Sequence, residues 1–448
     1  MKSEEIIGNY FAKNNYPLEA INQYLNTQCY EEALSLLEKN MDQFISKSLA
    51  KELLVAIDKF PDSYMRIKAV VPFAKGWSLF FLGDYGEALR FLEIALNTAK
   101  KENNEDLIGR VIQITANIYF SLDHHSKLIS FIRYQKKNVS VEHPLYAEIL
   151  RVSAQALGQI GCMKEAEAAW KELEEHPVVK QDPQFADVIR AIKAYNYLFL
   201  LGRFPEAEED MRSALKAFRA EDRMGISARV MAYYGSVKYI QGYLNESRNM
   251  VSQAVSDCEK ANQIFAKKPF LLLQAMNELD LGRPGQAAKT MEKFKENGWN
   301  RGISDNDKAE YVWKGYLLYA VKAALAEHKG NLHQFRVDAQ KAIQMVDRKE
   351  SFLDIYFLYT FLAVRFIRQN DPQYAQELLT DLEDFLFPVK TPYFKAHTWL
   401  LLASALYDQG HEDSAEVYLQ KALYTAKENK YEFLFLYWVL FNKNFIQL

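Results

Sequence analysis

One short pattern recurs along this 448-residue chain and limits the folds that it can adopt. A glycine is followed two residues later by a large apolar residue and five residues later by a small one, as in Gly83, Tyr85 and Ala88. With the last position as an anchor, ten copies can be placed, at Ala33, Ala88, Leu128, Ala166, Ala207, Ser247, Ala287, Phe335, Ala375 and Ala415. Most successive anchors are 38 to 41 residues apart, so the chain is a repeat with a period near 40 residues.

Each position of the pattern has a mechanical role. The glycine supplies the left-handed residue that ends a helix, and Asn370, the next best residue for that conformation, replaces it in one copy. The apolar residue packs into the junction of two helices. A second small residue seven positions after the anchor, such as Ala95, lies on the same helix face and lets neighbouring helices approach closely. The repeat is therefore a helix-turn-helix unit.

Composition agrees with a helical chain. Only 18 glycines and 12 prolines are present, fewer than an all-β or α/β protein of this length needs for its turns. The 49% of hydrophobic residues, many of them aromatic, exclude disorder and can form a large core. Each helix pair buries its apolar stripe against the next, so one elongated array is favoured over several compact domains.

The unit resembles the tetratricopeptide repeat, which has the same order of Gly, aromatic, Ala and Ala but a period of 34. The longer period predicts longer helices. The expected fold is all-α, a right-handed α-solenoid, or superhelix, of about ten tetratricopeptide-like helix-turn-helix repeats.

Two longer steps divide the expected repeats. The first, from Ala33 to Ala88, leaves room for an additional helix at about Asp42 to Lys59. The second contains a polar, glycine-containing loop before a helix that begins near Asp307, and this loop is a candidate hinge. The predicted segments are an N-terminal repeat plus the extra helix in residues 1–60, repeats in 61–296, the loop in 297–306, and repeats with an apolar terminal helix in 307–448.

The amino-terminal run from Tyr10 to Leu25, followed by the run from Tyr30 to Glu38, carries a further resemblance. It is similar to the stretch that opens the helical-repeat region of large bacterial transcription regulators of the maltose-activator type, which are signal-transduction (STAND) NTPases with a LuxR-type output domain. This resemblance implies a bacterial sensor that controls an attached NTPase and DNA-binding domain. The chain has no G-x-x-x-x-G-K-[ST] motif and no basic helix-turn-helix after the last repeat. It is therefore either an excised sensor region, which we favour, or a separate protein.

Charge and cysteine usage exclude several classes of function. The net charge is -3, and no basic block is denser than Lys136 and Lys137, so direct nucleic acid binding is not expected. Cys29, Cys162 and Cys258 are far apart and form no CxxC pair, which is typical of a reducing compartment. The chain lacks a signal peptide and an apolar run long enough to span a bilayer, so we expect no membrane association and a cytoplasmic location.

Catalytic chemistry has little support in the sequence. The eight histidines fall mostly in expected turns or near prolines, without the spacing of a metal site. No nucleophile motif or phosphate-binding loop is present. We therefore expect no enzyme activity, no catalytic residues, no metal and no cofactor.

Ligand recognition has more support. In a tetratricopeptide-like unit, the residues 18, 15, 11 and 8 positions before the anchor line the concave face. In the middle repeats these positions combine amides, arginines and aromatic rings, which suit a polar ligand. The candidate ligand-binding residues are Arg110, Gln113, Asn117, Arg151, Gln155, Asn196, Arg229 and Tyr239. The alternative interpretation is that they are scattered polar residues or lie between helices.

The last helix has apolar residues on all sides, so a covering element is expected over it. The proposed interaction surface is Phe433, Phe435, Trp438 and Phe441. A following domain, a second copy in a homodimer, or the last repeat itself could cover it.

Two functions remain open. In the first, the chain binds a small-molecule inducer or a peptide in its concave groove and passes this signal to attached or partner regulatory domains. In the second, it is a free-standing tetratricopeptide-repeat scaffold that binds partner proteins or peptides.

Overall fold

The computed structural model describes residues 2–46, 49–221, 223–261, 264–296, 315–346 and 350–435. In these residues all regular structure is helical, with 24 α-helices and two short irregular helical segments and without a β-strand. The predicted all-α solenoid fold is thus confirmed. The chain divides into two compact units, Met1–Val152 (unit 1) and Ser153–Leu448 (unit 2), and the boundary falls inside one helix.

Before the boundary helix, the described part of unit 1 contains nine α-helices and one 3-10 turn. In chain order they are α1 (Lys2–Lys13), α2 (Pro17–Asn26), α3 (Tyr30–Ser46), α4 (Ala50–Ile57), α5 (Tyr64–Ile67), α6 (Val70–Leu82), α7 (Tyr85–Glu102), α8 (Glu105–Ser121), α9 (His125–Gln135) and the 3-10 turn η1 (Lys136–Asn138). The boundary helix is α10 (Pro144–Gln159).

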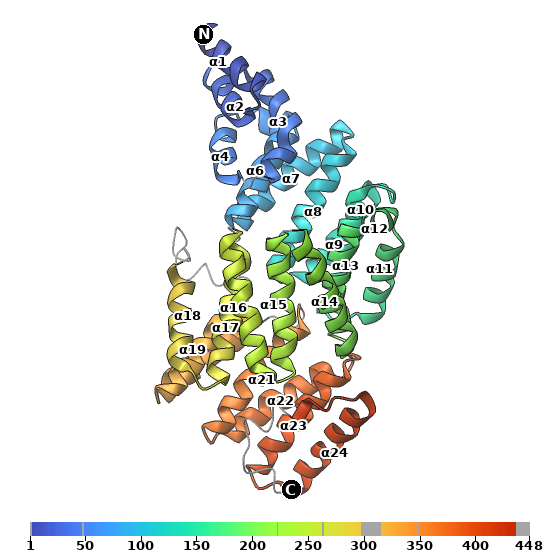
Figure 1. Ribbon diagram of the computed structural model, residues 1–448, viewed down its shortest axis with the longest axis vertical. Helices are drawn as coiled ribbons and strands as arrows, with labels where there is room; N and C mark the ends of the chain where they lie inside the picture. The colour runs from blue at the N-terminus through green and yellow to red at the C-terminus, as the bar shows by residue number, and fades with distance from the viewer. Residues whose placement is uncertain are drawn as a thin grey trace. The chain divides into compact units, whose positions relative to one another are not determined.

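Unit 2 is an array of helical hairpins (Figure 1). Its elements are α11 (Met163–Glu175), α12 (Pro177–Gln181), α13 (Pro183–Lys193), the π-helical turn η2 (Ala194–Leu198), α14 (Phe204–Ala220), α15 (Met224–Ile240), α16 (Leu244–Lys260), α17 (Ile264–Asp280), α18 (Pro284–Glu296), α19 (Gly315–His328), α20 (Leu332–Met345), α21 (Phe352–Arg368), α22 (Pro372–Leu386), α23 (Pro392–Tyr407) and α24 (Glu412–Asn429).

The predicted turns between paired helices all have the same backbone conformation. The residue five positions before each anchor has φ between 56° and 85°, in the left-handed region, at Gln28, Gly83, Asp123, Gly161, Gly202, Gly242, Gly282, Gly330, Asn370 and Gly410. Seven of these are glycines, as the pattern requires. The anchors themselves are all buried, at 0% exposure or, for Phe335 and Ala415, 1%. The repeat register read from the sequence is therefore correct in every copy.

The additional helix lies later than expected. The sequence placed it from about Asp42 to Lys59, but α3 continues through Asp42 to Ser46, and the extra helix is the shorter α4. The apolar stripe of α3 extends as far as Phe44, which is buried, so the added length of this helix buries more apolar surface. The loop 297–306 and the helix start near Asp307 lie outside the described residues.

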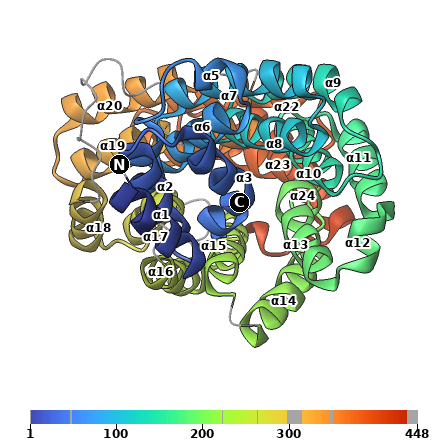
Figure 2. The same cartoon turned by 90° about the horizontal axis from the view of Figure 1, so that it is seen from above.

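In unit 2 the first helices of successive hairpins form an inner layer. Figure 2 shows α13, α15 and α17 inside α14, α16 and α18. Helix α21 contacts the carboxyl ends of three first helices, namely α10, α15 and α17. Ser351, which caps α21, bonds to Gln159 at the end of α10, and the ring of Phe357 stacks on Tyr239 near the end of α15. Fourteen of the 17 residues of α21 are buried as a result.

Helix α23 makes similar contacts beside α21. Phe394 packs edge-on against Phe199, with ring centroids 5.6 Å apart, and Tyr393 bonds to the main chain of α15. In Figure 1, α21 to α23 accordingly lie below α15 to α17. The carboxy-terminal hairpins of unit 2 thus pack on earlier hairpins of the same unit, in addition to their sequence neighbours.

Candidate ligand-binding site

The eight candidate ligand-binding residues are divided equally between the two units. Arg110, Gln113 and Asn117 lie on α8, and Arg151 lies on α10 before the boundary. Gln155, Asn196, Arg229 and Tyr239 belong to unit 2.

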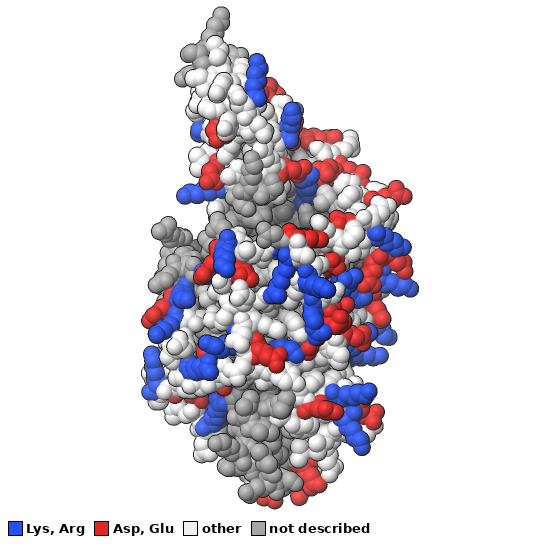
Figure 3. All heavy atoms as spheres, viewed as in Figure 1, with Lys and Arg blue, Asp and Glu red and all other residues white. Residues whose placement is uncertain are grey.

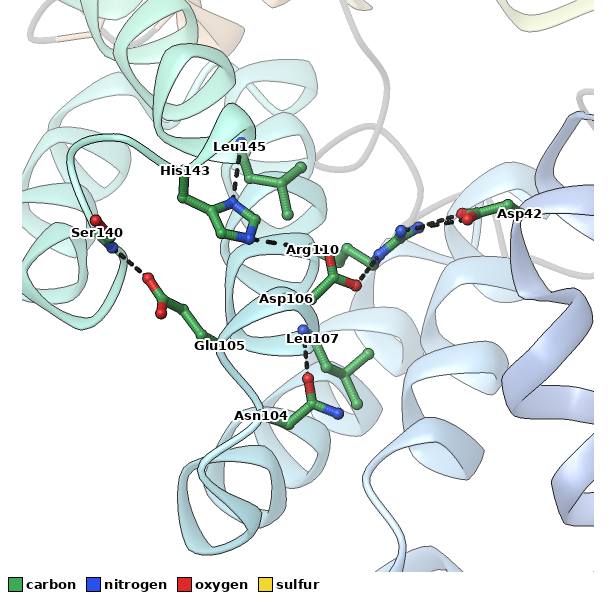
Figure 4. A network of polar contacts seen from close by, with 9 residues as sticks. All are labelled: Asp42, Asn104, Glu105, Asp106, Leu107, Arg110, Ser140, His143 and Leu145. Carbon is green, nitrogen blue, oxygen red and sulfur yellow. Dashed lines mark hydrogen bonds and ion pairs between the residues drawn. The ribbon is translucent and has the colours of Figure 1, made fainter.

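Arg110 is held by two carboxylates of unit 1 (Figure 4). Its Nη1 lies 2.5 Å from Asp42 on α3, and its Nε lies 2.6 Å from Asp106, one turn earlier on α8. Burial disfavours the charge on Arg110, but the hydrogen bonds to both carboxylates outweigh it and raise the pKa of the guanidinium above its usual value. The guanidinium is therefore fixed in one orientation.

The same network reaches the start of α10. The Nε2 of His143 is 4.0 Å from Asp106, and its Nδ1 accepts a hydrogen bond of 3.2 Å from the main-chain nitrogen of Leu145. Glu105 accepts a 2.5 Å bond from the main-chain nitrogen of Ser140. Polar contacts visible in Figure 4 thus join α3, α8 and the loop before α10.

Three candidate residues form a partly exposed row on α8. Arg110, Gln113 and Asn117 are three and four residues apart, so they share one face of the helix. The side chain of Arg110 is 27% exposed, and Gln113 and Asn117 are half-buried. This row can present a guanidinium and two amides to a polar ligand.

Arg151 has a partner from its own helix. Its Nε lies 2.8 Å from Glu148, and both side chains are half-buried. The role of Arg151 in binding stays a prediction.

Three candidates in unit 2 do not line an open surface. Gln155, Asn196 and Tyr239 are 5%, 2% and 4% exposed. Asn196 donates to the main-chain oxygen of Ile192 and accepts from Gln159 at 3.2 Å. The hydroxyl of Tyr239 donates a 2.5 Å bond to Asp280. These groups bond within the protein, which matches the alternative of polar residues between helices.

Asn196 lies in the π-helical turn η2, but its burial does not depend on that turn. Gln155 holds the same position of the repeat, 11 residues before its anchor, on the regular helix α10 and is also buried. The spacing rule therefore selected an interior position in both repeats. Tyr239 is buried for a different reason, because Phe357 of α21 covers its ring. Arg229, in contrast, is exposed on α15.

The proposed carboxy-terminal interaction surface is partly internal. The ring of Phe433 lies 5.0 Å from Phe204 and 5.6 Å from Tyr393, within an aromatic cluster of unit 2. Phe433 is therefore covered by its own chain. Phe435 is half-buried, and Trp438 and Phe441 lie outside the described residues.

The sequence reasoning missed a buried ionic cluster in unit 2. Arg365, at the end of α21, lies 2.6 Å from Asp280 on α17 and 3.5 Å from Glu327 on α19. The side chains of Arg365 and Asp280 are fully buried, and that of Glu327 is 5% exposed. An arginine within the apolar run of α21 was the signal, because a buried cation needs a carboxylate partner.

Two further features of the described residues bear on metal binding and on membranes. They contain no group of three or more His, Cys, Asp or Glu side chains placed to hold a metal ion. None of the helices in this part of the chain has the length and apolarity to cross a bilayer. On the face seen in Figure 3, positive and negative side chains are interspersed.

Part of the chain is similar to a known family of helical repeats. A tetratricopeptide repeat model matches residues 73–93, which include most of α6, the turn at Gly83 and the start of α7. No curated protein matches the chain.

Several solved structures are similar to this chain over most of its length. A Rap protein complexed with competence and sporulation factor is 13% identical to it, with a TM-score of 0.48. The match covers 94% of this chain and 99% of the Rap chain. Aspartyl phosphate phosphatase F from Bacillus subtilis is 14% identical with coverages of 92% and 93% and a TM-score of 0.40. A human IFIT1 dimer with PPP-AAAA is 13% identical with coverages of 91% and 89% and a TM-score of 0.41. At this identity the likenesses bear on the fold alone.

Proposed function

We propose that the chain is a non-catalytic, cytoplasmic recognition module that binds a peptide or a small polar ligand through the α8 row of Arg110, Gln113 and Asn117. The supporting observation is the partial exposure of these three side chains on one helix face, with Arg110 fixed by Asp42 and Asp106. A fixed guanidinium loses little entropy on binding, so its remaining N–H groups suit recognition of a polar group that accepts hydrogen bonds.

We further propose that this recognition serves regulation. The resemblance of the amino-terminal segment to maltose-activator-type regulators supports a sensor that controls an attached or partner NTPase and DNA-binding domain. The alternative is a scaffold that binds partner proteins without switching an output. The surrounding reading frame tests the attached form of the sensor, because that form requires an NTPase and a DNA-binding domain in the same chain.

Ligand binding can be tested by thermal shift with a panel of sugars, amino acids, nucleotides and short peptides. A ligand at 100 times its dissociation constant stabilises the folded state by about 2.7 kcal/mol. The double variant Gln113→Ala, Asn117→Ala should lose the shift while keeping the melting temperature of the free protein. The matched control is Gln420→Ala with Asn429→Ala, which removes two exposed amides from α24. Equal shifts in both double variants would place the ligand elsewhere.

A further inference from the structure

A ladder of parallel aromatic rings joins two adjacent first helices in unit 2. The ring of Tyr195, in η2, stacks on Tyr233 of α15 with centroids 4.5 Å apart and planes 10° apart. Tyr195 also stacks on Phe199, with centroids 5.5 Å apart and planes 10° apart. Tyr195 is therefore parallel to both rings and links Phe199 to Tyr233.

The ladder ends at a ring that solvent can reach. Phe199 is fully buried, but Tyr195 and Tyr233 are both half-buried. Tyr233 has no second ring contact among the residues that the structure describes. By comparison, the parallel pair of Tyr393 and His397 is closed, with both residues buried. A further planar group can thus extend the Tyr195–Tyr233 ladder.

The π-helical turn η2 places Tyr195 in this position. Tyr195, in this turn, is partly exposed beside α15, whereas Ala154, at the same position of the repeat on the regular helix α10, is fully buried. π-Helical turns are rare in proteins and frequently occur at functional sites. A regular α-helix through residues 194–198 would not bring Tyr195 to the same face.

A cation lies one helical turn from the end of the ladder. Arg229 precedes Tyr233 by four residues on α15, so the two share a helix face at a spacing of roughly 6 Å between Cβ atoms. Arg229 is exposed, and it makes no hydrogen bond or ion pair with any residue in the described part of the chain. Most arginines on neighbouring helices are paired, such as Arg190 with Asp187 and Arg212 with Glu209.

We propose that Tyr233, Tyr195 and Arg229 form a second binding site, for an aromatic ring that has a carboxylate a few bonds away, as at the carboxy terminus of a peptide that ends in phenylalanine. The ring stacks on Tyr233 and extends the ladder, and Arg229 pairs with the carboxylate. This site belongs to unit 2 and is independent of the α8 row.

The test uses the full chain and the tripeptide glycyl-glycyl-phenylalanine, with binding followed by ligand-observed NMR up to a few millimolar. We expect saturable binding that Tyr233→Ala weakens at least about tenfold, because one stacked ring contributes that much. Tyr233→Phe keeps the ring and should bind within about twofold of the wild type. Saturable binding that is equally strong in Tyr233→Ala would overturn the site, as would no binding to the wild type.

The arginine is tested with the same peptide and its carboxy-terminal amide. Arg229→Gln should weaken binding of the acid several-fold and leave binding of the amide unchanged. The matched control is Arg212→Gln, which removes an exposed arginine from the outer helix α14 and should change neither. Equal loss for acid and amide would contradict the pairing. A third probe, AMP, combines a planar ring with a phosphate, and tighter binding of AMP than of the peptide would overturn the assignment to a carboxylate. The variants of the α8 row should bind all three probes as the wild type does.

Discussion

The hydroxyl of Tyr393 donates a hydrogen bond of 2.6 Å to the main-chain oxygen of Ile240, 153 residues earlier in the chain. Ile240 is the last residue of α15, where helix carbonyl groups have no partner within the helix. A residue of α23 therefore completes the end of α15. Contacts of this kind make the stability of unit 2 depend on residues that are far apart in sequence.

Removal of this hydroxyl should be costly. In Tyr393→Phe the ring stays, but the buried carbonyl of Ile240 loses its partner, which costs about 1 to 3 kcal/mol. We expect a lower midpoint of urea unfolding, measured by circular dichroism. Tyr424→Phe, at a tyrosine that is 68% exposed, is the control and should leave the midpoint unchanged. Equal midpoints for Tyr393→Phe and the wild type would show that water or a neighbour replaces the bond.

The buried ionic cluster should be sensitive to loss of its cation. Arg365→Met leaves the carboxylates of Asp280 and Glu327 buried without their cation, and we expect a loss of about 3 to 5 kcal/mol in the free energy of unfolding. Arg336→Met is the control, because Arg336 is 65% exposed and its ion pair with Asp371 is at the surface. If both variants lose the same small amount, the cluster does not stabilise the fold.

Two glycines in the same position of the repeat should differ in their tolerance of alanine. Gly202 and Gly410 have φ of 76° and 79°, so both variants share a backbone cost of about 1 to 2 kcal/mol. A Cβ at Gly410 meets nothing within 4 Å, but at Gly202 it collides with the hydroxyl of Tyr431. Gly202→Ala should therefore be the less stable variant in thermal unfolding. Similar melting temperatures would mean that Tyr431 can move away at little cost.

Stability at mildly acidic pH should depend on His397. Burial lowers the pKa of His397 from 6.5 to about 4, and its Nδ1 lies 2.6 Å from the hydroxyl of Tyr356. Above pH 6.5 the histidine is neutral in both states and has no effect. Between pH 6.5 and 4 only the unfolded chain binds the proton, so the free energy of unfolding falls as the pH falls, by about 3 kcal/mol in total.

The variant His397→Gln removes the imidazole that binds this proton, so it isolates the contribution of His397 to the pH dependence of stability. Its urea unfolding free energy should fall less steeply between pH 6.5 and 4 than that of the wild type, whatever its stability at neutral pH. The comparison of slopes cancels the contributions of the other titratable groups. Parallel pH profiles would show that His397 is not the group responsible.

The local part of the fold could be predicted from the sequence. Residues such as Gly83 and Ala88 determine a helix end and a close helix contact within a few positions, so the turns and anchors were placed correctly. The length of α3 was not, because an apolar stripe does not reveal where its helix stops. The division at Val152 and Ser153 also left no mark on the pattern, since it lies inside α10.

The candidate site was predicted less well, for two physical reasons. The spacing rule selected a position that is buried at both Gln155 and Asn196, and it passed over Tyr195, which lies toward the surface in the π-helical turn. The rule also treats each hairpin as touching only its sequence neighbours. The contact of Tyr239 with Phe357 depends on how far the array turns per repeat, and small differences in that angle are not encoded in any single repeat.

The packing of α21 and α23 on earlier helices restricts how unit 2 can evolve. Repeat arrays commonly change length by gain or loss of whole units, because each unit contacts only its neighbours. Here the number of hairpins between α10 and α23 determines which helix end each later residue meets. Loss of one hairpin would bring Arg365 and Tyr393 opposite partners other than Asp280 and Ile240. A change in the number of repeats in this stretch would therefore require compensating changes in several distant side chains.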